Sequence, residues 1–251
     1  MKLVLTSDTH DGITKPGAIK RMFQNIKKKE SFDVLVHAGD YSGRYTAAGA
    51  VRDTVSTARE VFGDVPFVTT LGNHDYWVRG EKDMRTWDYE TPTLDAFMKN
   101  IAEIEEAFKK FNVWFLDNDG PFRKDGVTLF GHTGWYNHFN PPTNDWRFLP
   151  QNIEGASVHH WMNKRARDGF AANLDRLTPE DKKLVFVSHF SVVENDVPND
   201  YGGSDSTGTF LQHEFGVKMF LNGHSHRRFD GPMHFECGSD YMNPAYMVVE
   251  V

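Results

Sequence analysis

The sequence predicts an α/β fold, because strand-like and helix-like segments alternate in its first third and strand-like segments return in its second half. The apolar runs KLVLTSD, FDVLVHAGD and VPFVTTLGNHD have the length and composition of buried strands. Residues 16–30 and 46–62, which lie between them, carry apolar side chains at helical spacing. This order implies right-handed crossovers and largely parallel neighbouring strands.

Further elements follow along the chain. Residues 93–111 predict an amphipathic helix, and VWFLDN and VTLFGHTGW predict two strands after it. Three more strands are predicted at KLVFVSHF, VKMFLNGHSH and YMVVEV. We expect all of them to belong to one domain over residues 1–251, since a chain of this length fits one large α/β domain.

Two segments interrupt the regular pattern. Residues 136–163 contain Pro141-Pro142, several asparagines and bulky aromatic residues, and we interpret them as an insertion or cap of mixed helix and loop. Its aromatic and arginine side chains either stack a base and contact phosphate or pack a small core of the cap itself. Residues 194–209 are rich in Gly, Asn, Asp and Ser and predict a long loop over the site.

The composition limits which binding partners and which cellular compartment we expect. A formal charge of -7 argues against a broad basic surface that grips nucleic acid. The single cysteine, Cys237, excludes an intramolecular disulfide and favours a reducing compartment. The apolar run at the N-terminus is too short for a signal peptide, and we find no stretch of about 18 apolar residues. We therefore expect a cytoplasmic protein without a membrane partner; no oligomeric state follows from the sequence.

Polar side chains follow the predicted strands at five places. Two histidines in LNGHSHRR are either a chance pair on a loop or two metal ligands, so the other strand ends are informative. The residues at these ends are Asp8, His10, Asp40, Asn73, His74, Asp75, His189, His224 and His226. Because ligands of open α/β sheets bind outside the carboxyl ends of the strands, we expect these five loops to converge.

The residue types indicate a metal centre. Carboxylates, imidazoles and an amide are mixed oxygen and nitrogen ligands, which suit Mn, Fe, Zn or similar divalent ions. They are too many for one six-coordinate ion that must also bind water and substrate, and a pair of ions with one bridging carboxylate fits better. Each motif alone is a weak signal, since Gly-Asp is a common turn. All five motifs in this order, each at a strand end, leave little room for a purely structural explanation.

The order Asp-x-His, Gly-Asp, Gly-Asn-His-Asp, His and Gly-His-x-His resembles that of the calcineurin-like metallophosphoesterase superfamily, from residue 8 to residue 226. The resemblance implies two mixed β-sheets packed as a sandwich flanked by helices, with a dinuclear metal site at the strand ends. It implies a metal-dependent phosphoesterase that holds two divalent ions, Mn²⁺ or Fe²⁺/Fe³⁺ in the first place and Zn²⁺, Ni²⁺ or Co²⁺ as alternatives.

The resemblance also implies a role for each motif residue. One ion would be held by Asp8, His10, Asp40 and His226, and the other by Asp40, Asn73, His189 and His224, with Asp40 as the bridge. His74 matches the histidine that acts as general acid or positions the substrate. Asp75 either orients His74 or forms a salt bridge to a loop. For substrate binding we name Asn73, Arg44 and His132, while His37 is expected to be a buried or supporting residue.

The resulting hypothesis is hydrolysis of a phosphoester by a metal-bridging hydroxide, with a small phosphodiester such as a nucleotide as substrate. GNHD is commoner among the phosphodiesterases and nucleases of the superfamily than among its protein phosphatases. A nuclease and a phosphomonoesterase remain as alternatives, and a scaffold that has lost its catalytic centre is a third. The acidic balance disfavours the nuclease, because such enzymes grip several phosphates with Lys and Arg.

Overall fold

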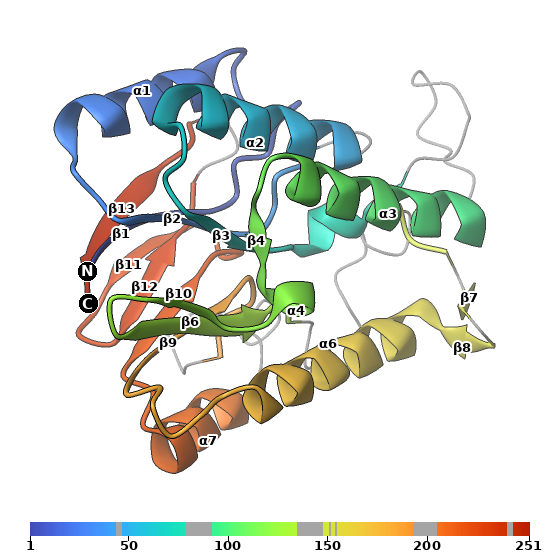
Figure 1. The fold of residues 1–251 in the computed structure, drawn as a ribbon. Helices are drawn as coiled ribbons and strands as arrows, with labels where there is room; N and C mark the ends of the chain where they lie inside the picture. The colour runs from blue at the N-terminus through green and yellow to red at the C-terminus, as the bar shows by residue number, and fades with distance from the viewer. Residues whose placement is uncertain are drawn as a thin grey trace.

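Two mixed β-sheets lie at the centre of the fold, and helices cover their outer faces (Figure 1). The structure is a computed structural model and describes residues 1–43, 47–78, 92–134, 148–150, 152–153, 155–192, 205–239 and 243–251. These two sheets confirm the sandwich that the resemblance implied.

The first sheet has the strand order β13-β1-β2-β3-β4. Its strands are β1 (Lys2–Thr6), β2 (Val34–Ala38), β3 (Phe67–Thr70), β4 (Trp114–Phe115) and β13 (Tyr246–Glu250). β1, β2, β3 and β4 are parallel, as the alternating pattern predicted, and β13 pairs antiparallel with β1. This last pairing places the two ends of the described chain side by side (Figure 1).

The second sheet has the order β11-β12-β10-β9-β6-β5. Its strands are β5 (Phe122–Lys124), β6 (Val127–His132), β9 (Lys183–Ser188), β10 (Met219–Asn222), β11 (Arg228–Asp230) and β12 (His234–Cys237). The four central strands are parallel and the two edge strands antiparallel. A separate short pair is formed by β7 (Asn152–Ile153) and β8 (Ala156–Ser157).

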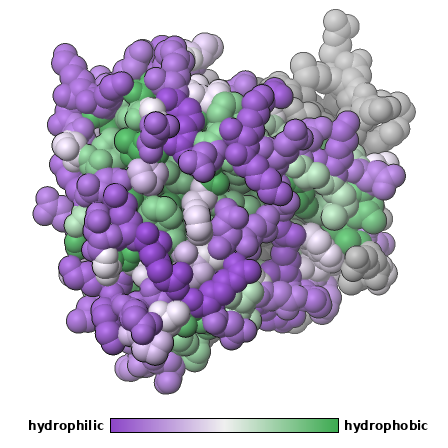
Figure 2. Space-filling model, viewed as in Figure 1, coloured by the Kyte–Doolittle hydropathy of each residue, from purple (hydrophilic) through white to green (hydrophobic). Residues whose placement is uncertain are grey.

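Helices α1 (Ala18–Lys29), α2 (Ala47–Phe62) and α3 (Leu94–Lys110) cover the first sheet, while α6 (Val158–Asp175) and α7 (Asp205–Phe215) lie along the second (Figure 1). Alternate residues of β1 show the layers. Val4 packs with the apolar faces of α1 to α3, whereas Leu3 and Leu5 pack with Val185 and other residues of the second sheet. The space-filling view shows a mostly hydrophilic face with apolar side chains between the polar ones (Figure 2). No helix among the described residues has the length and apolarity that crossing a bilayer requires.

Three predicted boundaries were wrong. VWFLDN is a strand only at 114–115, because the Asp119 carboxylate accepts the Phe115 N–H and starts the short helix α4 (Leu116–Asp119). The segment 194–209 is not a loop throughout, since α7 begins at Asp205 and buries Leu211 against the second sheet. The helix of the predicted cap, α6, continues to Asp175, and most of the rest of 136–163 lies outside the described residues, as does the first part of 194–209.

Candidate metal centre

The loops after β1, β2, β3, β9 and β10 meet at one edge of the two sheets. The turns after β1, β2 and β10 need backbone conformations that L-residues seldom adopt. Among the described non-glycine residues with positive φ are five of the predicted ligands: Asp8, His10, Asp40, His224 and His226, at 52°, 42°, 58°, 73° and 56°. Such strain is tolerated where the surroundings fix the geometry, which is typical of functional sites.

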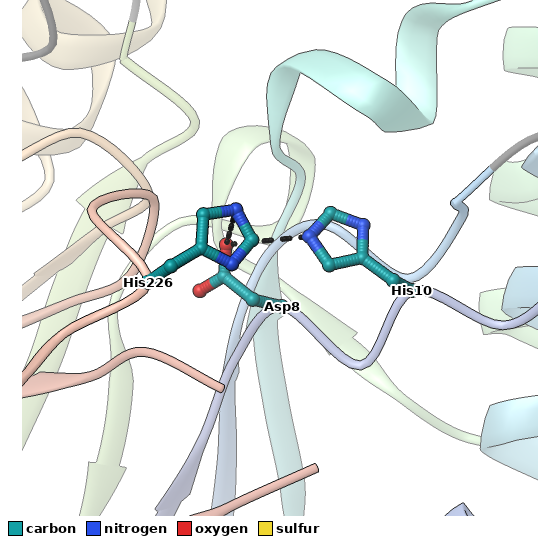
Figure 3. A group of neighbouring side chains, drawn as sticks. All are labelled: Asp8, His10 and His226. Atoms are coloured by element: carbon teal, nitrogen blue, oxygen red, sulfur yellow. Dashed lines mark ion pairs between the residues drawn. The ribbon is translucent and has the colours of Figure 1, made fainter. Parts of the chain in front are cut away.

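Asp8, His10 and His226 form the first group of side chains (Figure 3). Asp8 Oδ1 lies 3.8 Å from the Nε2 atom of each histidine, and the two imidazole rings are stacked with centroids 4.9 Å apart. The other side of the Asp8 carboxylate is occupied by protein donors, since Oδ2 accepts the Ser7 hydroxyl at 2.6 Å and the His224 N–H at 3.0 Å. Oδ1 is therefore the oxygen that faces the histidines.

Asp40, His189 and His224 form the second group. Asp40 Oδ2 lies 3.4 Å from His189 Nε2, and it is also 3.8 Å from His10 Nε2 and 3.9 Å from His74 Nε2. Although this oxygen is buried, it accepts no hydrogen bond of acceptable geometry from the described part of the chain. Asp40 thus stands between the two groups and contacts members of both.

Backbone carbonyls fix three of the imidazoles. His10 Nδ1 pairs with Ser42 O at 3.0 Å, His189 Nδ1 with Ala38 O at 2.7 Å and His226 Nδ1 with Ser239 O at 2.7 Å. Because Nδ1 faces a carbonyl, the Nε2 atom of each ring is directed at the cluster and can bind a cation once it carries no proton. This pattern of an anchored imidazole is typical of histidines that bind metal.

Two glycines let the loops approach one another. A Cβ atom on Gly72 would collide with the Asp40 carboxylate, and one on Gly223 would collide with Ser7 and the Asp8 carboxylate. Neither position can carry a side chain, because the predicted ligands of the adjoining loop occupy that space. The glycines of the sequence motifs are therefore required by the convergence of the loops.

Burial and mutual charge set the electrostatics of the cluster. Burial lowers the pKa of His10, lowers that of His224 well below its usual value and lowers that of His74 to about 3, so these rings are neutral at pH 7. Burial also lowers the pKa of His189, but the neighbouring Asp40 carboxylate outweighs it and raises this pKa to about 9. Burial raises the pKa of Asp40, and His189 and His74 together bring it well below the usual range.

The chemistry of this donor set fits a pair of divalent cations. Two carboxylates and neutral imidazoles supply hard oxygen and borderline nitrogen ligands. His189 Nε2 and His224 Nδ1 lie 3.1 Å apart, a spacing that requires a proton or a cation between two lone pairs. The buried Asp40 Oδ2 faces imidazoles from both groups. The side chains that could hold the ions therefore lie close together in the folded chain.

Asp75 has a different setting from the other motif residues. Its carboxylate accepts four backbone N–H groups, those of Gly72, Asp40, Tyr41 and Ser42, at 2.8–3.1 Å. The side chain therefore contacts the loop that carries Asp40 through backbone amides, and neither of the two predicted alternatives for Asp75, orienting His74 or a salt bridge to a loop, is settled by these contacts. A role of Asp75 in catalysis stays a prediction.

The remaining predicted site residues lie as follows. Asn73 begins the short 3-10 helix η1 (Asn73–Tyr76), directly precedes His74 and is buried. The His132 ring lies against Phe170 and Phe186, and its Nδ1 atom accepts the Gly134 N–H, so these contacts belong to the second sheet and α6 instead of the cluster. Arg44 lies outside the described residues.

The expected supporting residue His37 is fully buried and stacked on Tyr41, with Nε2 3.1 Å from the Thr9 hydroxyl.

Three residues of the site were not predicted. Glu236 of β12 is buried, and its Oε1 atom accepts the N–H of Ser225, which lies between His224 and His226. The Ser239 carbonyl anchors His226, and Trp77 stacks on His74. A lone acidic residue inside the strand-like run HFEC was a usable signal for Glu236, because a buried carboxylate needs a partner.

A family model described as calcineurin-like phosphoesterase matches residues 1–228. Several solved structures share the fold, two of which follow. TT1561 of Thermus thermophilus has a TM-score of 0.55 at 12% identity, covering 94% of this chain and 88% of the other. GAP50, described as the anchor in the inner membrane complex of Plasmodium, has a TM-score of 0.51 at 15% identity, covering 95% and 71%. No curated protein sequence matches the chain significantly.

Proposed function

The chain belongs to the calcineurin-like phosphoesterase family and is a phosphoester hydrolase, and we propose that it hydrolyses small phosphodiesters, such as cyclic or other nucleotides, with two divalent metal ions. The position of Asp40 carries the proposal. Its Oδ2 atom lies within 3.4–3.9 Å of imidazole nitrogens from both groups, which is the arrangement a shared carboxylate needs.

Asp8, His10, Asp40 and His226 would hold one ion, and Asp40, Asn73, His189 and His224 the other. Mn²⁺ and iron are the first candidates and Zn²⁺ an alternative, since these ligand types accept each of them. When bound, two such ions lower the pKa of water and neutralise the oxygens of a phosphoryl group.

The protein's own contribution is to hold these side chains in place before substrate arrives. Carbonyls fix the imidazoles of His10, His189 and His226 through Nδ1, and amides fix the Asp75 carboxylate that supports the Asp40 loop. Preorganised ligands of this kind need no rearrangement during the reaction, which lowers its barrier.

His74 is proposed to supply the proton that the leaving oxygen needs. Its Nε2 atom lies 3.9 Å from Asp40 Oδ2, and its ring meets the His10 ring edge-on at 4.8 Å, so it lies at the border of the cluster. Burial lowers the pKa of this imidazole to about 3. A phosphate dianion or monoanion beside the ring would favour the protonated form and so reverse part of this shift.

The net charge of the chain supports a small substrate over a polynucleotide. A formal charge of -7 gives no broad basic surface along which several phosphates of a nucleic acid could bind. A small ester needs only the metal pair and a few local contacts. We therefore favour a nucleotide-sized diester over a polynucleotide.

A panel of esters tests the proposal. Protein loaded with Mn²⁺ is expected to hydrolyse bis-p-nitrophenyl phosphate faster than p-nitrophenyl phosphate, and chelation of the metal is expected to abolish both reactions. Faster cleavage of the monoester would make the chain a phosphomonoesterase. Rapid cleavage of long single or double strands would make it a nuclease, and two bound ions without any esterase activity would overturn the proposal.

A further inference from the structure

Three aromatic rings form a stack that ends at the metal cluster. The His74 ring lies on Trp77 with centroids 3.6 Å apart and planes 22° apart. Trp77 in turn stacks on Phe148 at 4.6 Å and 22°. His74 belongs to η1 and Trp77 is the residue that follows this helix, whereas Phe148 comes from the predicted cap. The cap thus contacts His74 through one intervening side chain.

The His74 ring is held differently from the other histidines of the cluster. Those of His10, His189 and His226 are fixed by carbonyl groups at Nδ1. His74 Nδ1 is buried, and within the described residues it has no hydrogen-bond partner. Its backbone N–H donates to Asp40 Oδ1 at 3.0 Å, and its Nε2 atom lies 3.9 Å from Asp40 Oδ2, beyond hydrogen-bond distance. The rotation of the imidazole is therefore set by its ring contacts, and that with Trp77 is the closest of them.

Backbone hydrogen bonds fix Trp77 and the residue that follows it. Its N–H donates to the His74 carbonyl at 3.2 Å, which closes the end of η1. The next residue, Val78, is buried and donates its N–H to the Phe148 carbonyl at 2.9 Å. One backbone hydrogen bond and one ring stack therefore join residues 77–78 to Phe148, so that a shift of Phe148 would be passed to the Trp77 ring.

We propose that Trp77 is a positioning residue for His74, and that Phe148 of the cap acts on the reaction through Trp77. The proposal rests on the proposed function, because His74 is assigned there as the proton donor. Trp77 does not bind the metals or the reacting group. It holds the imidazole at the angle from which Nε2 faces the cluster, a task that a hydrogen bond at Nδ1 performs for the neighbouring histidines.

Two variants separate stacking from bulk. Trp77→Phe keeps an aromatic ring that can stack, while Trp77→Leu keeps apolar volume without a π-face. Trp114→Ala is a matched control, because Trp114 is a half-exposed tryptophan of β4 whose indole donates to Gly120 O and contacts Phe122, outside the cluster. Phe148→Leu tests the outer member of the stack.

The first measurement does not depend on activity. In zinc-loaded protein, the ring resonances of His74 are identified by their loss in His74→Asn. A tryptophan stacked at 3.6 Å shields these protons, so Trp77→Leu is expected to move them downfield, whereas Trp114→Ala leaves them in place. Unchanged His74 resonances in Trp77→Leu would overturn the stack itself.

The second measurement is kinetic, on bis-p-nitrophenyl phosphate with metal content checked. Trp77→Leu is expected to lower kcat about 3- to 10-fold, the effect of losing one aromatic contact to the proposed proton donor His74, with KM and two bound ions unchanged. Trp77→Phe should recover most of kcat, and Phe148→Leu should show a smaller loss. A wild-type kcat in Trp77→Leu, or loss of a metal ion instead of kcat, would overturn the positioning role. An inactive wild-type protein would instead overturn the proposed function, and the resonance shift would still report on the stack.

Discussion

The Asp75 carboxylate accepts the backbone N–H of Asp40 at 2.9 Å, and this hydrogen bond helps to join the Gly-Asn-His-Asp loop to the Gly-Asp loop. The same carboxylate accepts the amides of Gly72, Tyr41 and Ser42. Burial raises the pKa of Asp75 to about 7, a shift that the Asp40 charge adds to and the amides oppose. The conformation of Asp40, with its positive φ, therefore depends on a residue outside the proposed ligand set.

Replacing Asp75 by Asn should loosen the Asp40 loop, because an amide NH₂ would face backbone N–H donors. We expect a loss of about 2–4 kcal/mol in the free energy of unfolding and weaker binding of both ions, read from thermal unfolding with and without Mn²⁺. Asp181→Asn is the matched control: this carboxylate has side-chain exposure of only 4% and binds Arg123, Thr128 and Thr178. It should lower the melting temperature and leave the metal-induced rise intact. An equal metal-induced rise in Asp75→Asn would show that the loop is fixed without Asp75.

Replacing His74 by Asn should remove the proposed proton donor and leave the metal ligands in place. The kcat for bis-p-nitrophenyl phosphate is expected to fall about 10²–10⁴-fold, the range for general acid–base groups. Elemental analysis should still find two ions per chain. A variant that turns over at nearly the native rate would remove His74 from the mechanism.

Metal binding should depend on pH through His189. The Asp40 carboxylate overcomes the effect of burial and raises the pKa of His189 to about 9, so below that pH the metal-free ring carries a proton on the atom that faces Asp40. A cation must displace this proton, and the apparent affinity for Mn²⁺ should therefore rise about tenfold per pH unit from 7 to 8.5 and level off above about 9. Titration calorimetry in buffers of different ionisation enthalpy should record one released proton at pH 7.5. No proton release at that pH would contradict the assignment of His189.

The same raised pKa has a consequence for the metal-free protein. A histidine whose pKa is raised on folding stabilises the native state fully below its unfolded value of 6.5, and this stabilisation is lost as the pH rises through about 9. The melting temperature of the metal-free chain should fall across that interval. In the His189→Gln variant the melting temperature of the metal-free protein should change less with pH over this interval.

Glu236 should matter for the ion that involves His226. Its Oε1 atom accepts the Ser225 N–H at 3.0 Å and so stabilises the turn that carries His224 and His226. Glu236→Ala is expected to weaken Mn²⁺ binding about 10- to 100-fold, the usual effect of losing a group that supports a ligand. Glu236→Gln keeps the acceptor oxygen and should bind metal nearly as the wild type does. Equal affinity in all three proteins would mean that this loop is held in place without Glu236, by its hydrogen bonds to Ser239 and Gly238.

The sequence could predict the centre of the site because its parts are local. Asp-x-His, Gly-Asp and Gly-His-x-His each end a short apolar strand, and parallel strands bring their carboxyl ends to one edge. The supporting contacts are not local. Glu236 and Ser239 lie beyond residues 1–228 that the family model matches, and they reach the cluster only because β12 pairs beside β10. The helix start at Asp205 was missed since a run rich in Gly, Asp and Ser favours a loop until tertiary packing of Leu211 is known.

The central claim is that Asp40 joins two metal ions, and the EPR spectrum of Mn²⁺-loaded protein tests it most directly. The wild type should bind two ions per chain and show the exchange-coupled spectrum of a pair with a shared ligand. His226→Ala and His224→Ala should each bind one ion first and lose the coupling, because their side chains belong to opposite groups of the cluster. A single bound ion in the wild type, or two ions with uncoupled spectra, would contradict the account.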